Sequence, residues 1–162
     1  MEVRAAEEHE IDQLAAIWFD GWQDAHAQIV PAELTRLRTV GNFRERLLAA
    51  LSSIRVIGPP GAPVGFCIVR DDELYQLFVS ATSRGSGAAA ALIVDAEVRL
   101  AATGVENAWL ACAIGNARAA RFYEKHGWRR AGTMINQAET PNGPFALEVS
   151  RYEKSLTRPD NR

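Results

Sequence analysis

The segment 84–89, Arg-Gly-Ser-Gly-Ala-Ala, stands directly before an alanine-rich stretch whose apolar residues have helical spacing. Where a loop leads into a helix, the first backbone amides of the helix lack partners within it, and the helix dipole adds positive charge at that end. Glycine at 85 and 87 lets the backbone approach a ligand closely, and Arg84 adds a full positive charge. The segment therefore predicts a phosphate or diphosphate site.

Two other kinds of phosphate loop fit this segment less well. A P-loop needs a Lys and a Ser or Thr after its last glycine, whereas Ala88 and Ala89 follow here. A dinucleotide-binding loop needs three glycines in the first strand-helix-strand unit, but this loop has two and lies in the middle of the chain. For the loop taken alone, the alternative is a turn that only starts a helix.

The first part of the chain predicts helices that bury one face. Between residues 9 and 27, apolar side chains recur three or four positions apart, and Pro31 prevents a continuation. A second helical stretch follows, which we expect to break at Gly41 and to restart with Asn42 as its N-cap. A short strand near residues 2–6 is expected before both.

The rest of the chain predicts a mixed sheet. From residue 53 the apolar pattern changes to alternation, which indicates three strands that follow one another in antiparallel order. The glycine loop then connects the third strand to a helix and a returning strand, so that this part forms a parallel crossover. The expected elements are strands at 53–58, 64–70, 73–79 and 107–114, helices at 88–102 and 117–126, and a hairpin within 128–152 that turns near 141–143.

The order of these elements, together with two motifs, resembles the GCN5-related N-acetyltransferase (GNAT) superfamily. The family's first motif, R/Q-x-x-G-x-G/A at the start of the central helix, is matched by Arg84, Gly87 and Ala89. Its second motif, N-x-x-A-x-x-x-Y-x-x-x-G-F/W, is matched by Asn116, Ala119, Tyr123, Gly127 and Trp128.

The resemblance implies an α/β (α+β) fold with a mixed, mostly antiparallel sheet. About seven strands, splayed between the fourth and the fifth, would carry about four helices on their two faces. The whole of residues 1–156 would form one GNAT domain, and we expect 157–162 to be a flexible tail. Dimers are common in the family, so the resemblance is compatible with a homodimer.

The resemblance also implies acetyl-CoA as co-substrate, bound between the strands at 73–79 and 107–114. The backbone of 84–89 would hold the pyrophosphate, and the free strand edge would hydrogen-bond the pantetheine arm as a neighbouring strand does. No metal is expected, because the histidines are scattered and both cysteines lie in apolar stretches. The cofactor-binding residues expected are Leu77, Phe78, Val79, Arg84, Gly85, Ser86, Gly87, Ala88, Ala89, Asn116 and Tyr123.

Acetyl transfer to an amine raises two proton problems. An alkylammonium with a pKa near 10.4 must lose a proton before attack, and a departing thiolate leaves more easily when it is protonated. By resemblance Tyr123 is the general acid, the alternative being an aromatic that only fills the helix–sheet interface. Some family members place a glutamate six residues before the last valine of the fourth strand, so the resemblance implies Glu73, six residues before Val79, as the candidate base, the alternative being a solvated turn residue. Other family members place a glutamate on the fifth strand, where this chain has Ala111.

The acceptor is expected to approach from the first helix, where four rings follow one another: Trp18, Phe19, Trp22 and His26. Such a cluster would bind an apolar or cationic group, and Trp22 and His26 are the predicted acceptor-binding residues. The alternative is that these rings belong to the core. His26 is also a second candidate base, because the ordinary pKa of histidine lies near neutrality.

Composition limits the partners. A formal net charge of −2 gives no electrostatic reason to expect nucleic acid. The acidic N-terminus lacks the apolar core of a signal peptide, and no stretch is long and apolar enough to span a membrane, so a cytoplasmic protein without a membrane partner is expected.

The function expected from these observations is acetyl-CoA-dependent N-acetyl transfer to a primary amine of a small molecule or a protein. The amine would attack directly, through a tetrahedral intermediate. The missing fifth-strand glutamate leaves an alternative, a non-catalytic acyl-CoA-binding regulatory module.

Overall fold

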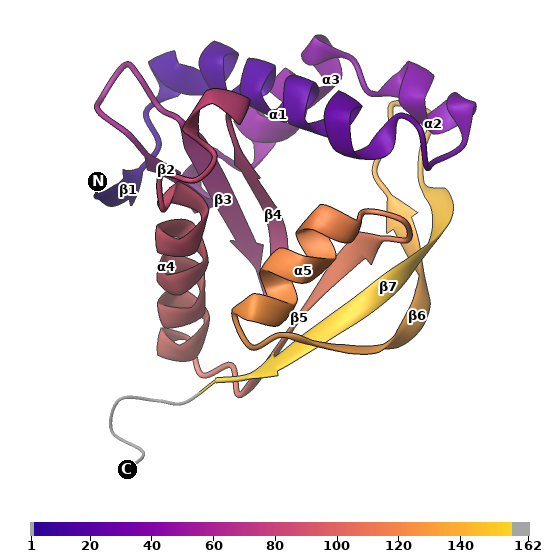
Figure 1. Ribbon diagram of the computed structural model, residues 1–162. Helices are drawn as coiled ribbons and strands as arrows, with labels where there is room; N and C mark the ends of the chain where they lie inside the picture. The colour runs from indigo at the N-terminus through magenta and orange to yellow at the C-terminus, as the bar shows by residue number, and fades with distance from the viewer. Residues whose placement is uncertain (1, 157–162) are drawn as a thin grey trace.

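The computed structural model describes residues 2–156, so the expected flexible tail at 157–162 lies outside the described residues. Within them the strands form one seven-stranded sheet of order β1-β2-β3-β4-β5-β7-β6 (Figure 1). Every neighbouring pair is antiparallel except β4 and β5, which confirms the mixed sheet. The strands are β1 (Val3–Ala5), β2 (Ile54–Ile57), β3 (Gly65–Arg70), β4 (Glu73–Val79), β5 (Asn107–Ala113), β6 (Arg129–Ala138) and β7 (Phe145–Ser155).

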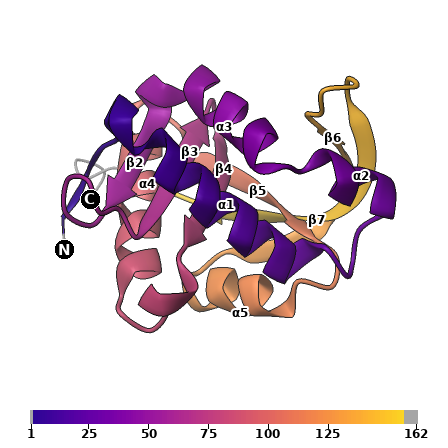
Figure 2. The same ribbon diagram turned by 90° about the horizontal axis from the view of Figure 1, so that it is seen from above.

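The helices cover both faces of this sheet (Figures 1 and 2). On one face, α1 and α3 bury a core that includes Trp18, Phe43 and Phe66. On the other face, α4 packs against β3 and β4, and α5 packs beside it over β5 and β7. The helices of the described residues are α1 (Ile11–His26), α2 (Ala32–Leu37), α3 (Val40–Ala49), α4 (Ala88–Ala102) and α5 (Ala117–Lys125), with short 3-10 turns at Glu8–Glu10, Leu51–Ser53 and Ala81–Ser83. None of these helices is long and apolar enough to cross a lipid bilayer.

The start of α3 corrects one expectation. The helical stretch breaks before Gly41, and the N-cap is Thr39, whose hydroxyl accepts a hydrogen bond from the amide of Asn42 at 3.0 Å. Asn42 lies three residues inside the cap and is buried, where its side chain accepts a hydrogen bond from Arg38. Both residue types cap helices well; here Thr39 is the cap, and the side chain of Asn42 is engaged by Arg38, four residues earlier.

The sheet opens between β4 and β5. Glu73 and Trp109 form the one parallel pair in the described register of these strands. Asp72 fixes this point twice, because its carbonyl accepts the backbone amide of Trp109 at 3.2 Å and its carboxylate accepts the indole Nε1 at 2.9 Å. Beyond it β5 pairs with β7, whereas Leu77–Val79 pair with β3. The edge of β4 that faces β5 is therefore free over this stretch, as the splayed sheet predicts.

Helix α1 crosses β4 closely at Gly21. A Cβ on this glycine would lie 2.6 Å from Cδ1 of Phe78, closer than any real contact of this kind. The absence of a side chain at Gly21 therefore lets α1 rest on the ring of Phe78, beside the opening of the sheet.

Candidate functional site

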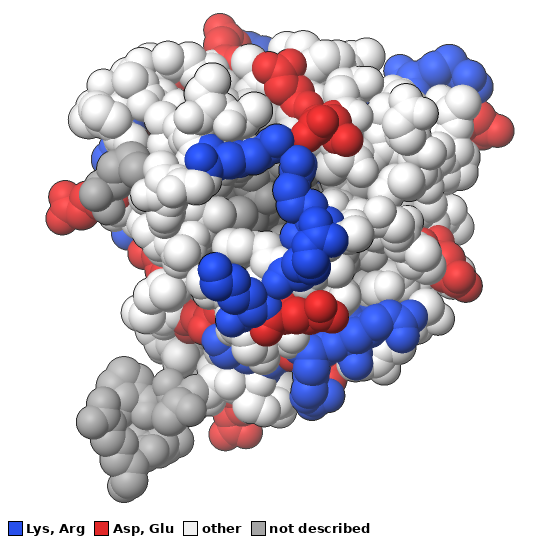
Figure 3. Space-filling view, viewed as in Figure 1, with Lys and Arg blue, Asp and Glu red and all other residues white. Residues whose placement is uncertain are grey.

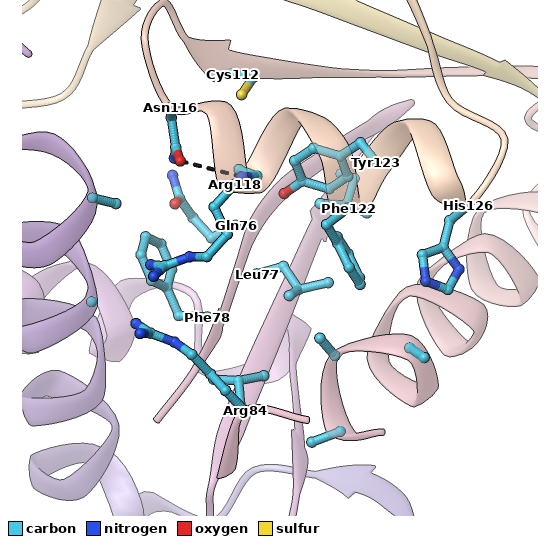
Figure 4. Close-up of a pocket in the computed structure, with 18 of the residues that line it drawn as sticks. Gln76, Leu77, Phe78, Arg84, Cys112, Asn116, Arg118, Phe122, Tyr123 and His126 are labelled. Carbon is cyan, nitrogen blue, oxygen red and sulfur yellow. Dashed lines mark hydrogen bonds between the residues drawn. The ribbon is translucent and has the colours of Figure 1, made fainter. Parts of the chain in front are cut away.

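A cavity of about 590 Å³ lies over the opening between β4 and β5, and is called the larger cavity below. Its floor is β4 and β5, and its walls are the loop before α4, the first turn of α4 and the inward face of α5 (Figure 4). Among the predicted cofactor residues, those that line it are Leu77, Phe78, Val79, Arg84, Gly85, Gly87, Ala88, Ala89, Asn116 and Tyr123.

The loop before α4 offers free backbone donors to this cavity. Gly85 and Gly87 have φ angles of +82° and +89°, a left-handed conformation that side chains disfavour. A Cβ on either would meet open space. Within residues 2–156, the amides of Gly85, Gly87, Ala89 and Ala90 donate to no other group. Such donors at the start of a 15-residue helix are suited to bind phosphate oxygens.

Ser86 has a different place from the one expected. It does not line the larger cavity, and its hydroxyl donates to the carbonyl of Ser83 and accepts the amide of Ala88 at 3.3 Å. The Ala88 amide is thus already engaged, although its residue lines the cavity. Because the hydroxyl reaches the loop's own backbone, Ser86 shapes the loop instead of facing a ligand.

Basic side chains surround the mouth of the larger cavity (Figure 3). Arg84 and Arg118 both donate to one carboxylate oxygen of Asp24 on α1, at 2.9 and 3.0 Å. Lys125 lies on the same wall as Arg118. The sequence reasoning missed Arg118 and Lys125, although their spacing of seven residues, with Phe122 between them, puts all three on one face of α5.

Tyr123 extends from α5 with its hydroxyl toward the larger cavity (Figure 4). Its ring packs near Trp128 and Tyr152, and its hydroxyl has no hydrogen-bond partner in the part of the chain that the structure describes. Burial, with smaller effects from Cys112 and Cys67, raises the pKa of the phenol well above its ordinary value. The ring therefore packs as a core aromatic, while the hydroxyl stays protonated and free.

Helix α5 begins where the second motif predicts. Asn116 is the N-cap, and its side-chain oxygen accepts a hydrogen bond from the amide of Ala119 at 3.3 Å. The helix carries Tyr123 two turns later, and Gly127 follows its end with a φ of +86°. The motif thus fixes the helix that holds the tyrosine.

A second cavity of about 120 Å³, called the smaller cavity below, lies on the other side of the opening. It is enclosed by α1, the segment 34–46, β4, and the hairpin of β6 and β7. The two cavities share five lining residues: His26, Tyr75, Gln76, Ala111 and Ala113. They therefore meet at the point where β4 and β5 separate.

Glu73 lines the smaller cavity from the start of β4. Only 8% of the residue is exposed, and its nearest cation is Arg70, at 3.7 Å between Nη2 and Oε1. Burial raises the pKa of the Glu73 carboxyl from 4.5 to about 7, with Arg70 opposing the shift. The residue is thus a buried carboxyl beside the opening, not a solvated turn residue.

Trp22 and His26 also line the smaller cavity, and Trp22 belongs to the core as well. Their ring centroids lie 5.3 Å apart. Burial, assisted by the positive charge of Arg38, lowers the pKa of His26 to about 4. His26 is therefore neutral near pH 7. Trp18 is a core residue that reaches the cavity wall, whereas Phe19 is not among the lining residues.

The sequence reasoning did not find three arginines of the smaller cavity, Arg38, Arg46 and Arg70. They come from the α2–α3 connection, from α3 and from the end of β3. No motif links them, and only the packing of α3 and β3 around the same space could bring them together.

Comparisons with known proteins agree with this geometry. The family profile described as "Acetyltransferase (GNAT) family" matches residues 8–128. Over 112 residues the chain is 34% identical to an uncharacterized N-acetyltransferase of Mycobacterium tuberculosis, which covers 66% of this chain and 69% of that protein. The chain belongs to the GNAT family and is an N-acetyltransferase.

Solved structures have the same fold at lower identity. A GCN5-related N-acetyltransferase from Rhodopseudomonas palustris superposes with a TM-score of 0.75 at 21% identity, over 96% of this chain and 95% of that one. An N-acetyltransferase from Thermoplasma acidophilum in complex with coenzyme A superposes with a TM-score of 0.71 at 17% identity, over 96% and 98% of the two chains.

Proposed function

We propose that this enzyme transfers the acetyl group of acetyl-CoA directly to a primary amine, with Glu73 as base and Tyr123 as acid. The observation that carries the proposal is the meeting of the two cavities at the β4–β5 opening. Glu73 lines one cavity and Tyr123 lines the other. A base on the acceptor side and an acid on the cofactor side is the arrangement that direct transfer needs.

The larger cavity is assigned to acetyl-CoA. Its free amides at the start of α4 would bind the pyrophosphate, with Arg84 and Arg118 adding positive charge at the mouth. The free edge of β4 at Leu77–Val79 would hydrogen-bond the extended arm of the cofactor. When bound, acetyl-CoA supplies the activated acetyl group.

Glu73 would take the proton from the ammonium group of the acceptor, directly or through a water. With a pKa of about 7 it is ionised in a large part of the molecules at neutral pH, yet more basic than an ordinary carboxylate. His26 is the weaker candidate, because a pKa of about 4 makes its imidazole a poor proton acceptor. Burial thus lowers the pKa of His26 and raises the pKa of Glu73, and both shifts favour Glu73 as the base.

Tyr123 would give its proton to the sulfur of the departing CoA. Its raised pKa keeps that proton available at neutral pH. Cys112 also lines the larger cavity, but burial raises its pKa to about 11, so it stays a thiol and is a poor nucleophile. Direct attack by the amine is therefore favoured over an acetylated cysteine.

A cytoplasmic location, one domain over residues 1–156 and the absence of a nucleic-acid partner remain predictions.

The test combines acetyl-CoA binding by calorimetry with release of CoA thiol against a panel of primary amines. Tyr123→Phe should lower kcat by about 10²- to 10⁴-fold, because it removes one general acid, and leave acetyl-CoA affinity unchanged. Tyr152→Phe is the matched control, since this buried tyrosine lines neither cavity. Binding without CoA release from any amine would favour the regulatory module instead.

A further inference from the structure

The smaller cavity holds more positive charge than its own carboxylates neutralise. Arg38, Arg46 and Arg70 line it, and the acidic residues among its lining residues are Glu73 and Glu139. Arg70 interacts with both acids, at 3.7 Å from Glu73 and 2.7 Å from Glu139. Within the described residues, Arg38 and Arg46 have no carboxylate within ion-pair distance.

Arg38 is held in place by hydrogen bonds, but its guanidinium keeps an unused hydrogen-bond donor. It is 4% exposed, and its Nη1 donates to the side chain of Asn42 at 3.1 Å and to the main-chain oxygen of Glu139. Nε and Nη2 of Arg38 donate to no group in residues 2–156; Nε is enclosed by the protein, so Nη2 is the unused donor that a ligand can reach. A buried guanidinium with unused donors beside a cavity is suited to bind an anion from outside the chain.

Arg46 is held in a similar way. Its Nη2 donates to the hydroxyl of Tyr75 at 2.7 Å, and its guanidinium lies 4.4 Å from the ring centroid of Trp18. Nε and Nη1 of Arg46 donate to no described group; Nε is enclosed by the protein, so Nη1 is the unused donor that a ligand can reach. The Arg46 guanidinium is thus packed on the ring of Trp18 and keeps an unused hydrogen-bond donor.

The other groups that face this cavity do not offset the charge. His26 is neutral near pH 7, and Glu73, with a pKa of about 7, is only partly ionised there. Burial and the proximity of Arg46 lower the pKa of Arg38 to about 10, which still leaves it charged. The cavity therefore carries net positive charge at neutral pH.

We propose that the acceptor is a small primary amine that also carries an oxyanion, which we take to be a carboxylate. Arg38 and Arg46 hold this oxyanion while the amine faces Glu73. The proposal rests on the function proposed above and names the substrate class of the same site. Nη2 of Arg38 and Nη1 of Arg46 give the two guanidinium groups one accessible unused donor each, and charge-assisted hydrogen bonds of this kind suit the oxygens of a carboxylate. A cavity of about 120 Å³ has room for a small molecule of this kind.

This substrate class replaces the apolar or cationic acceptor that the aromatic cluster suggested. The face of Trp18 is already occupied by Arg46, and the guanidinium of Arg70 lies 3.7 Å from the ring centroid of Tyr75. The rings therefore position arginines, which would repel a second cationic group on the acceptor, whereas the reacting ammonium faces the Glu73 carboxyl.

The decisive experiment measures product binding, which needs no turnover. N-acetyl amino acids that differ in side chain are titrated into the CoA-loaded protein by calorimetry, each against its own amide. The carboxylates should bind about 10- to 100-fold more tightly than the amides, the size of effect expected for charge-assisted hydrogen bonds. Equal binding across every pair, or tighter binding of the amides, overturns the proposal.

Variants assign the preference to the two arginines. Arg38→Gln and Arg46→Gln should each remove most of the difference between acid and amide, with acetyl-CoA affinity unchanged. Arg44→Gln is the control, because Arg44 lies on α3 like Arg46 but pairs with Asp12 at the surface and lines neither cavity. If Arg38→Gln lowers the melting temperature through its contact with Glu139, Arg46→Gln carries the test alone. A preference that survives Arg46→Gln contradicts the assignment.

Turnover separates this proposal from the proposed function. CoA release that is faster with amino acids than with their amides supports both proposals. Equal release with acids and amides overturns the substrate class and leaves the transferase intact. A protein that binds N-acetyl amino acids more tightly than their amides, yet releases no CoA, supports the anion site and contradicts the proposed catalysis.

Discussion

The larger and the smaller cavity offer a ligand different kinds of chemical group, which come from differently spaced parts of the chain. Above its floor of β4 and β5, the larger cavity offers a ligand backbone amides within 85–90 and one helix face within 116–126, two short stretches of sequence. The smaller cavity depends on side chains, which arrive from α1, the segment 34–46, β4 and the hairpin of β6 and β7. The groups offered to the cofactor thus come from two local structures, whereas the charged groups of the smaller cavity come from segments far apart in the chain.

This difference explains which part of the function is common to the family. Backbone amides bind phosphates whatever side chains surround them, so a loop and helix start can serve many proteins with the same cofactor. The acceptor site is a set of charges that a few substitutions can change. The fold and the cofactor therefore follow from family membership, whereas the acceptor has to be derived from this chain's own arginines and carboxylates.

The largest expected effect comes from Glu73 in the smaller cavity, whose substitution should impair catalysis without affecting the larger cavity. Glu73→Gln should lower kcat/KM by about 10²- to 10⁴-fold, because it removes the base, and leave acetyl-CoA affinity unchanged. In the unmodified enzyme kcat/KM should rise as the pH increases through about 7, where Glu73 loses its proton. The variant should lack this rise and keep only the increase due to the free amine near its own pKa. A pH–rate profile checks both, and a rise near pH 7 that persists in the variant contradicts the assignment.

A smaller effect should appear on the cofactor side alone. Gly87→Val places a β-branched side chain at a φ of +89° and displaces the free amides, so acetyl-CoA should bind about 10- to 100-fold more weakly. Binding of N-acetyl amino acids to the smaller cavity should not change.

Gly61→Val is the matched control for this substitution. Gly61 also has a positive φ, +79°, with open space at its Cβ position, but it lies in the β2–β3 loop outside both cavities. Calorimetry and thermal melting of both variants separate loop geometry from general strain. Equal losses of acetyl-CoA affinity in Gly87→Val and Gly61→Val would show that the start of α4 does not bind the cofactor specifically.

The smallest expected effect concerns the mouth of the larger cavity. Asp24→Asn releases Arg84 and Arg118 from their shared carboxylate, so acetyl-CoA should bind about 2- to 5-fold more tightly at low ionic strength. Higher salt should reduce the gain, because the groups are exposed. Asp20→Asn, one turn earlier on α1, is the control. Weaker binding in Asp24→Asn would mean that Asp24 positions the arginines for the cofactor instead of competing with it.

The helix caps show how far sequence patterns can be followed. Asn116 caps α5 as predicted, because the cap and the amide it binds lie three residues apart. Thr39 caps α3 instead of the predicted Asn42. Two suitable capping residues stand three positions apart, so the capping pattern alone does not tell which is used, and in the structure the side chain of Asn42 instead binds Arg38.

By itself, the sequence determined the strands, the glycine-rich start of α4 and the helix that carries Tyr123. These features depend on backbone angles and hydrogen bonds between residues close together in the chain, so short patterns specify them. Tertiary structure alone decided that Arg38, Arg46 and Glu73 surround one cavity, and it alone raised the pKa of Glu73. Burial and the distances between charges belong to the packed chain, because they are set by segments that no spacing in the sequence brings together.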